Sequence, residues 1–311
     1  MSLSSDNFTA LVHLRDQARK WKNIAFIIAI IATALISEMF FSSKDEEISA
    51  VDGGKDYIAN INIEGIILND EYRDKILNKI AEQENIKAVI VNINSPGGGI
   101  VGSEILYENL QKISKNKPIV VVMGALAASG GYMASIASDY IIAHNGTLTG
   151  SVGVIIQASE VTELANKLGV NFLVYKSAKL KGVPSPFEKT DPQIDRVINE
   201  SIQDSNEFFI NLVLERRKDK INQKEISIIK DGRFFTGRQA LEVGLIDEIG
   251  GKDQAINYLS KIHKIDIKNL KVKDVPIEKT DNGLVRFFGK DTVSKILGLS
   301  TEQKGLMAVF R

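Results

Sequence analysis

The 311-residue chain contains no cysteine. That absence excludes disulfide bonds, thiolate catalysis and cysteine-ligated metals, so any nucleophile in this chain is an oxygen or a nitrogen. Histidine is also scarce, with only His13, His144 and His263. The 39 basic and 39 acidic side chains balance, which leaves no basic excess of the kind that nucleic-acid-binding proteins carry. At 44% hydrophobic residues, the composition is that of a globular protein with a sizeable core.

One long apolar run stands out, because residues 24–36 read IAFIIAIIATALI. Met39, Phe40 and Phe41 extend it to about 18 residues, close to the roughly 20 that a bilayer-spanning helix needs. Basic residues precede the run and a mainly acidic segment follows it: Arg15, Arg19, Lys20 and Lys22 on one flank, Lys44, Asp45, Glu46 and Glu47 on the other. The positive-inside bias then predicts that residues 1–22 stay in the cytoplasm.

We expect residues 23–42 to form a single-pass anchor in the inner (cytoplasmic) cell membrane, with the rest of the chain on the outer side. A cleaved signal peptide and a buried soluble helix are the alternatives. Cleavage is disfavoured because the small-residue triplet at 32–34 lies inside the apolar run and no such site follows it. The polar, glycine-bearing residues 43–56 are expected to link the anchor to a globular domain.

From Tyr57 onward, short apolar segments alternate with amphipathic ones. Strands are expected at 57–65, 87–95, 118–124, 139–144, 153–157 and 170–175, and helices at 71–85, 103–116, 161–169 and 191–218. Asp191 and Pro192 are typical of the cap and first position of the last of these helices. The alternation predicts an α/β domain over 57–264, with a parallel sheet and flanking helices. Beyond residue 265 the regularity fades, and residues 265–311 are expected to be a docked or loose tail.

Two glycine-rich segments follow predicted strands. NSPGGG at 94–99 lies at the carboxyl end of a strand, where ligands usually bind in open α/β sheets and where free backbone amides can hold an anion or an oxyanion. ALAASGGYMASIAS at 125–138 places Ser129 after another strand and at the start of a helix, a setting that suits a nucleophile. The structural alternatives are a tight turn at the first segment and an N-cap serine at the second.

A nucleophilic Ser129 needs a base to take its proton. His144 is one candidate, since His13 precedes the apolar run and His263 lies at the periphery. The other candidates are the lysines of YKSAKLKGVPSPF at 175–187, which are Lys176, Lys179 and Lys181. Burial lowers the pKa of a lysine and turns it into a usable base. Three solvated lysines on a surface loop are the alternative interpretation.

Five motifs in order, NSPGGG, AASGGYMAS, TLTGSVGV, KLKGVPSPF and DGRFFTGRQALEVGLIDEIGG, resemble those of the signal peptide peptidase A family. This family comprises serine proteases with a Ser/Lys dyad in the crotonase and Clp-protease superfamily. The resemblance covers roughly Tyr57 to Asp253. It implies a crotonase/Clp-protease-like parallel sheet, with no metal and no cofactor.

The resemblance also implies a role for each matching residue. The nucleophile falls on Ser129 and the general base on Lys181, although Ala178 and Gly182 depart from the family's usual S-G-x-x-K-D loop and keep Lys179 open as the base. Ser151, in T-G-S-V-G, matches the serine that orients the lysine amine. The oxyanion hole falls on two amides, those of Gly98 and Gly130.

The implied function is that of a membrane-anchored serine endopeptidase that degrades remnant signal peptides or other short hydrophobic peptides. The family's dome-like homo-oligomeric rings imply an active site shared between protomers, and no nucleic-acid partner is expected. Two other interpretations stay open. One is a catalytically inactive membrane-anchored scaffold, and the other is a crotonase-type enzyme acting on an acyl thioester.

Overall fold

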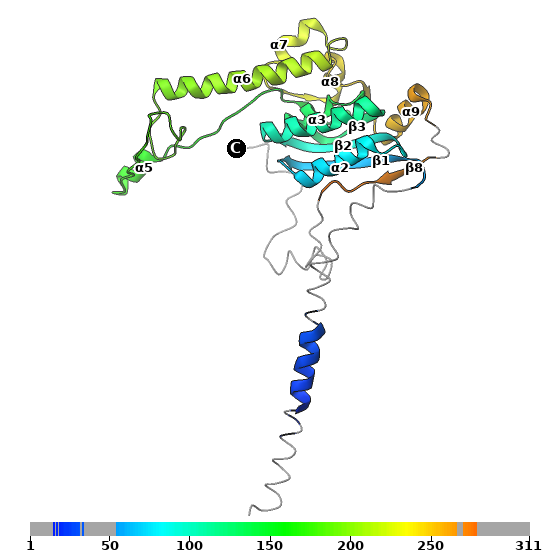
Figure 1. Ribbon diagram of the computed structural model, residues 1–311. Helices are drawn as coiled ribbons and strands as arrows, with labels where there is room; N and C mark the ends of the chain where they lie inside the picture. Colours follow the sequence, from blue (N-terminus) through cyan, green and yellow to red (C-terminus); the bar gives the residue numbers. More distant parts are fainter. Residues whose placement is uncertain are drawn as a thin grey trace, which may run out of the picture. The chain divides into compact units, whose positions relative to one another are not determined.

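The computed structural model describes residues 15, 17, 19–31, 33, 54–265 and 270–278 (Figure 1). Residues 19–31 are helical, but no helix within the described ranges is both long and apolar enough to cross a membrane. Most of the predicted linker and the last part of the tail lie outside these ranges, as does the end of the predicted anchor. The anchor over 23–42 therefore stays a prediction.

The compact unit Gly53–Glu278 is built around an eight-stranded sheet. Its strands are β1 Tyr57–Ile67, β2 Ile86–Gly98, β3 Ile119–Ala128, β4 Tyr140–Ala143, β5 Leu148–Gly150, β6 Phe234–Thr236, β7 Glu248–Ile249 and β8 Lys271–Asp274. The main order is β6-β5-β3-β2-β1-β8, and every pairing is parallel except that of β5 with β6. The predicted α/β architecture with a parallel sheet is thus confirmed.

Strand β3 has two partners along one edge. Its first half, Val120–Met123, pairs with β4, and its last residues, Leu126–Ala128, pair with β5. Strands β4 and β5 therefore pair with successive parts of the same edge of β3. Because β5 pairs with the last residues of β3, it lies next to Ser129, the residue that follows β3. Strand β6 pairs with β5 in turn.

The helices flank the sheet in Figure 1, except α5, which lies away from it. They are α2 Glu71–Glu82, α3 Ile100–Asn116, α4 Gly130–Ser135, α5 Thr162–Lys167, α6 Pro192–Arg216, α7 Ile226–Ile229, α8 Gly237–Val243 and α9 Lys252–His263, with a 3-10 turn at Gln223–Glu225. Asp191 caps α6, because its side chain accepts the N–H groups of Gln193 and Ile194. The predicted start of this helix is therefore confirmed, and the carboxylate satisfies amides that a helix start leaves free.

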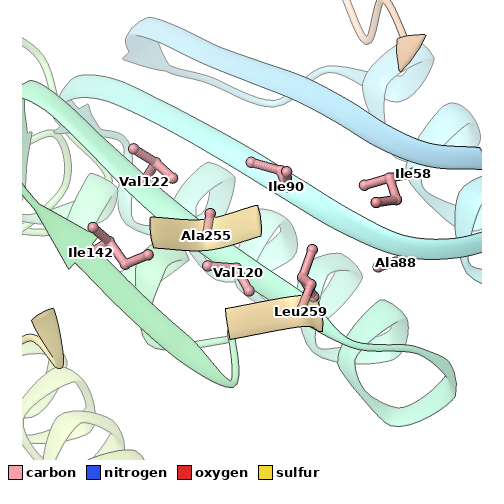
Figure 2. Packing of buried hydrophobic residues seen from close by; sticks show 8 residues of the cluster. All are labelled: Ile58, Ala88, Ile90, Val120, Val122, Ile142, Ala255 and Leu259. Carbon is pink, nitrogen blue, oxygen red and sulfur yellow. The ribbon is translucent and has the colours of Figure 1, made fainter. Parts of the chain in front are cut away.

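One face of the sheet packs on α9. Figure 2 shows Ala255 and Leu259 of α9 against Ile58, Ala88, Ile90, Val120, Val122 and Ile142, one or two residues from each of β1 to β4. The intervening strand residues, such as Ile61, Val89 and Val121, are also buried. A sheet buried on both faces requires near-continuous apolar strands, which explains the unbroken apolar runs Ala88–Val91 and Ile119–Met123 of β2 and β3.

Two expected strands are wrong. Residues 153–157 and 170–175 are apolar and β-branched, but neither is a strand in the structure. A strand needs a neighbour that completes its hydrogen-bond ladder, and among the described residues these segments have no strand partner. Conversely, residues Lys271–Asp274 were expected to belong to the tail, but they form strand β8 and pair with β1.

Candidate active site

Ser129 occupies the turn between β3 and α4 with an unusual backbone conformation, φ 53° and ψ −121°. Its N–H donates to the carbonyl of Gly150 at 2.8 Å, and its own carbonyl accepts the Met133 N–H at 2.9 Å. Ser129 occupies the N-cap position of α4, as the structural alternative predicts, but its hydroxyl makes no capping hydrogen bond, so capping does not explain why this residue is a serine. A non-glycine residue held in this region stores about 1–3 kcal/mol of strain, and such strain concentrates at functional sites.

The two glycine-rich segments meet at this turn. Gly97 has φ 97°, and a Cβ built on it would lie 2.6 Å from the Gly130 nitrogen and 3.0 Å from the Ser129 Cβ. The backbones of the two turns are therefore in direct contact, which only a glycine at position 97 permits. The structure brings together the segments that the sequence singled out separately.

Ser95 holds the glycine turn in place. This residue is fully buried, and its hydroxyl accepts the Gly97 N–H at 3.0 Å and donates to the Gly65 carbonyl at 2.6 Å. A single side chain thus ties the end of β1 to the turn after β2. The roles of Ser95 and Gly97 were not predicted, although both residues lie in NSPGGG, because the contacts that a residue makes with distant parts of the chain do not follow from its sequence motif.

The backbone N–H groups of Gly98 and Gly99 differ in whether they bond β1. The Gly99 N–H donates to the Ile67 carbonyl at 3.0 Å. The register pairs Ile67 with Gly98, a parallel pairing in which Ile67 bonds the residues on either side of its partner. In a regular parallel ladder the Gly98 N–H then does not bond β1. Gly130 opens α4, where amides have no intrahelical acceptor.

Ser151 directly follows the carbonyl that holds the Ser129 amide. It too has a positive φ, 50°, and its N–H donates to the Arg233 carbonyl at 2.8 Å. Across the described ranges only three non-glycine residues have a positive φ, and the third, Lys264, is merely the C-cap of α9. The two serines that the sequence analysis selected are thus strained neighbours.

Two polar side chains, of which Arg216 is half-buried and Tyr132 is fully buried, make hydrogen bonds that hold α4 and the residues after it. The Arg216 guanidinium donates to the Ile136 carbonyl at 2.8 Å and approaches those of Ala137 and Ser138. A cation at this end of a helix stabilises the free carbonyls there. Burial raises the pKa of the Tyr132 hydroxyl, which donates to the Leu245 carbonyl at 2.9 Å. Both contacts fix the helix whose first residues would face the reacting atoms.

The next residue, Arg217, is buried and pairs with Asp247 at 2.9 Å. Burial alone would raise the pKa of Asp247, but the hydrogen bonds from Arg217 and Lys220 and from the Ile141 amide outweigh it and lower that pKa. This network joins the residues that follow α6 to β4 and to the segment between α8 and β7. It therefore anchors the C-terminal end of α6 beside α4.

Lys181 lies far along the chain from these groups, in a segment that we call the arm, residues 154–190. In Figure 1 the arm, which carries α5, extends from the start of α6 away from the sheet. Lys181 is exposed, and its amine makes no hydrogen bond or ion pair with any described residue. Within one chain the structure therefore does not bring Lys181 to Ser129.

The other two candidate lysines, Lys176 and Lys179, form ion pairs. Lys176 forms an ion pair with Glu188, and Lys179 lies 2.6 Å from Asp191, the cap of α6. The hydrogen bond from Lys179 lowers the pKa of the Asp191 carboxyl. A lysine held by a carboxylate is a poor base because the pairing favours its charged form. Of the three candidates, Lys181 alone has an amine without such a partner in the described structure.

His144 is no better placed. It follows β4, its backbone N–H donates to the Thr147 hydroxyl at 3.0 Å, and its ring lies against Gly251 at the start of α9. No described contact joins His144 to Ser129.

The arm is ordered and yet apolar on its surface. The Val161 N–H donates to the Pro186 carbonyl at 2.9 Å, and the rings of Phe172 and Phe187 lie 4.3 Å apart. Many of its large apolar side chains are nonetheless exposed, up to 90% for Tyr175: Ile155, Ile156, Leu164, Leu168, Val170, Phe172, Leu173, Val174, Tyr175 and Phe187. An apolar surface of this extent marks an interaction site.

Comparison with known proteins gives the following matches. Peptidase family S49 matches residues 111–266. The "Putative signal peptide peptidase SppA" of Enterococcus faecium is 34% identical over 246 residues, covering 74% of this chain and 71% of that protein. Protease 4 of Haemophilus influenzae is 32% identical over 259 residues, covering 79% of this chain and 40% of that protein. Among solved structures, a mutant of the 1510-N membrane-bound stomatin-specific protease matches with a TM-score of 0.43 and 18% identity, over 71% of this chain and 98% of that one.

Proposed function

This chain belongs to peptidase family S49, and we propose that it is a membrane-anchored serine endopeptidase with Ser129 as nucleophile and Lys181 as general base. One observation carries the proposal. The Ser129 hydroxyl makes no hydrogen bond to a described residue, and its strained turn lies directly before the Gly130 amide and against Gly97, the residue that precedes Gly98. That arrangement supplies a nucleophile and two donors for an oxyanion.

The proposed reaction is acyl transfer to water. Neutral Lys181 accepts the hydroxyl proton of Ser129, and Oγ attacks the peptide carbonyl carbon while the amides of Gly98 and Gly130 stabilise the oxyanion. The C–N bond then breaks, and the lysine ammonium gives its proton to the leaving amine. Water attacks the resulting ester, the lysine again acts as base, and the acid and free Ser129 are released. Ser151 would hold the amine in position.

We propose that Lys181 reaches Ser129 from a neighbouring copy of the chain. Within one chain the amine is exposed and remote, while the arm that carries it is ordered and presents apolar side chains such as Leu173 and Tyr175. Packing against another copy would bury these side chains. It would also supply partner strands for segments 153–157 and 170–175, which have the composition of strands. The same packing would remove water from Lys181, which favours the neutral amine. A homo-oligomeric ring with shared sites satisfies these conditions.

The apolar run at 24–36 supports an anchor in the inner (cytoplasmic) membrane, with the catalytic unit on its outer side. An anchored peptidase meets peptides that are released into the bilayer. We therefore propose remnant signal peptides and other short hydrophobic peptides as substrates.

The test is hydrolysis by the full-length chain, solubilised in mild detergent, of two peptides matched in length. One is apolar with small residues at its centre, and the other carries acidic residues in place of the apolar ones. We expect the apolar peptide to be cleaved at least tenfold faster, while a Ser129→Ala chain gives the background rate. No cleavage of either peptide by an assembled wild-type chain would favour an inactive scaffold.

A further inference from the structure

We propose that Asp231 is a positioning residue that sets the backbone of both active-site serines through the turn Asp231–Arg233. The inference rests on the proposed function. It concerns a motif, DGR, that contributes no group to the reaction as described above. Asp231 touches neither substrate nor reacting atoms and would act only through the turn.

The turn is closed by one carboxylate. Asp231 accepts the backbone N–H of Arg233 at 3.1 Å, and its two oxygens lie 2.9 and 2.7 Å from the Nε of the same residue. Gly232 between them has φ 83°, a conformation that glycine adopts without strain. An aspartate that bonds the amide two residues on forms a local turn by itself. The guanidinium adds a charged bond, which lowers the pKa of Asp231.

The turn continues into the site through backbone hydrogen bonds. The carbonyl of Arg233 accepts the Ser151 N–H at 2.8 Å. One residue earlier, Gly150 pairs with Phe234 of β6, and its carbonyl accepts the Ser129 N–H at 2.8 Å. Asp231 is thus linked to Ser151 by two successive hydrogen bonds, through the N–H and the carbonyl of Arg233. The link continues to Ser129 through Gly150, which precedes Ser151 in the chain and accepts the Ser129 N–H.

This linkage matters because both serines are strained. A positive φ at a serine persists only where its surroundings over-determine it. β5 and β6 are three residues each, so their ladder is too short to fix the start of β6 firmly. The carboxylate fixes the Arg233 carbonyl, and that carbonyl holds the Ser151 amide. Without the turn, the Ser151 backbone would be free to relax toward negative φ.

The same contacts contribute little to global stability. The side chains of Arg233 and Asp231 are 53% and 38% exposed, and exposed ion pairs contribute little to stability because water screens them. A variant of Asp231 can therefore separate positioning from folding. Glu82, whose ion pair with Lys112 at 3.1 Å is also exposed and lies on α2 and α3, provides a matched control.

The experiment compares full-length Asp231→Ala, Asp231→Asn and Glu82→Ala chains in hydrolysis of the apolar peptide and in hydrogen exchange of the Ser151 amide. Misplacing a reacting group by a fraction of an ångström costs roughly 10- to 100-fold in rate, so we expect Asp231→Ala to lose that much in kcat with KM within about twofold. Asparagine can still accept the Arg233 N–H, so Asp231→Asn should recover most of the rate. Hydrogen exchange of the Ser151 amide should accelerate in Asp231→Ala and in neither of the other two variants.

Unchanged exchange at Ser151 in Asp231→Ala would overturn the inference whether or not the wild-type chain hydrolyses peptides. So would a kcat within twofold of wild type in that variant, or an equal loss in Asp231→Asn or Glu82→Ala. By contrast, a wild-type chain that assembles and cleaves nothing refutes the proposed function, while hydrogen exchange still decides the role of the turn.

Discussion

Full-length chains carrying Ser129→Ala or Lys181→Ala are expected to be inactive alone and to regain hydrolysis when they assemble together. Removing a nucleophile or its base costs on the order of 10⁴-fold or more in kcat, because the remaining groups cannot replace proton transfer. In a mixed assembly, a site that combines Ser129 from one chain with Lys181 from another is intact. Random mixing of equal amounts through a head-to-tail interface makes about one quarter of the sites intact.

The control for this experiment is Lys179→Ala, which removes the lysine that is paired with Asp191. If Lys181 is the base, Lys179→Ala should keep activity within about tenfold of wild type, the loss reflecting only a looser arm. Activity is measured on the apolar peptide, and co-assembly is verified by affinity capture of one tagged variant. Absence of recovery in verified mixed assemblies would refute the shared site, and an active Lys181→Ala chain would refute the base.

Replacing Gly97 by alanine is expected to abolish most activity. The added Cβ would lie 2.6 Å from the Gly130 nitrogen and 3.0 Å from the Ala128 carbonyl oxygen, at a φ of 97°. The turn must shift away from α4, and loss of one oxyanion donor costs about 10²–10³ in kcat. The strain should also lower the free energy of unfolding by about 1–3 kcal/mol. Hydrolysis and thermal unfolding measure the two effects.

Gly99 provides the matched control two residues away. It has no heavy atom within 4 Å of a built Cβ, and its φ of −65° suits any residue. Gly99→Ala should therefore retain near wild-type kcat, although a change at a helix cap alters stability by a few tenths of a kcal/mol. Equal losses in both variants would show that the turn tolerates no side chain at all and that the contact with Gly130 is not the cause.

The sequence was most informative where local chemistry decides the structure. The apolar strands at 87–95 and 118–124, the α6 start at Asp191 and the positions of Ser129 and Gly98 at strand ends all follow from periodicity, capping and turn residues. These features depend on neighbours in the chain. The parallel sheet then brings the two glycine-rich turns together, because both follow strands that run in the same direction.

The sequence was least informative where contacts are distant or come from outside the chain. The segments 153–157 and 170–175 have the composition of strands, but composition does not reveal that the described part of the chain offers them no partner strand. The hydrogen bond between Ser151 and Arg233 joins residues 82 positions apart in the sequence. Likewise, nothing in the spacing of Lys176, Lys179 and Lys181 shows which amine is held by a carboxylate.

The most direct test of the central claim, that Lys181 activates the Ser129 hydroxyl, is labelling of the assembled full-length chain with a fluorophosphonate, followed by mapping of the modified residue. A fluorophosphonate reacts with an activated serine and forms a stable bond to Oγ. The account predicts a label on Ser129 in the wild-type chain and none in the Lys181→Ala chain. A label on another residue, or equal labelling of Ser129 in both chains, would contradict it.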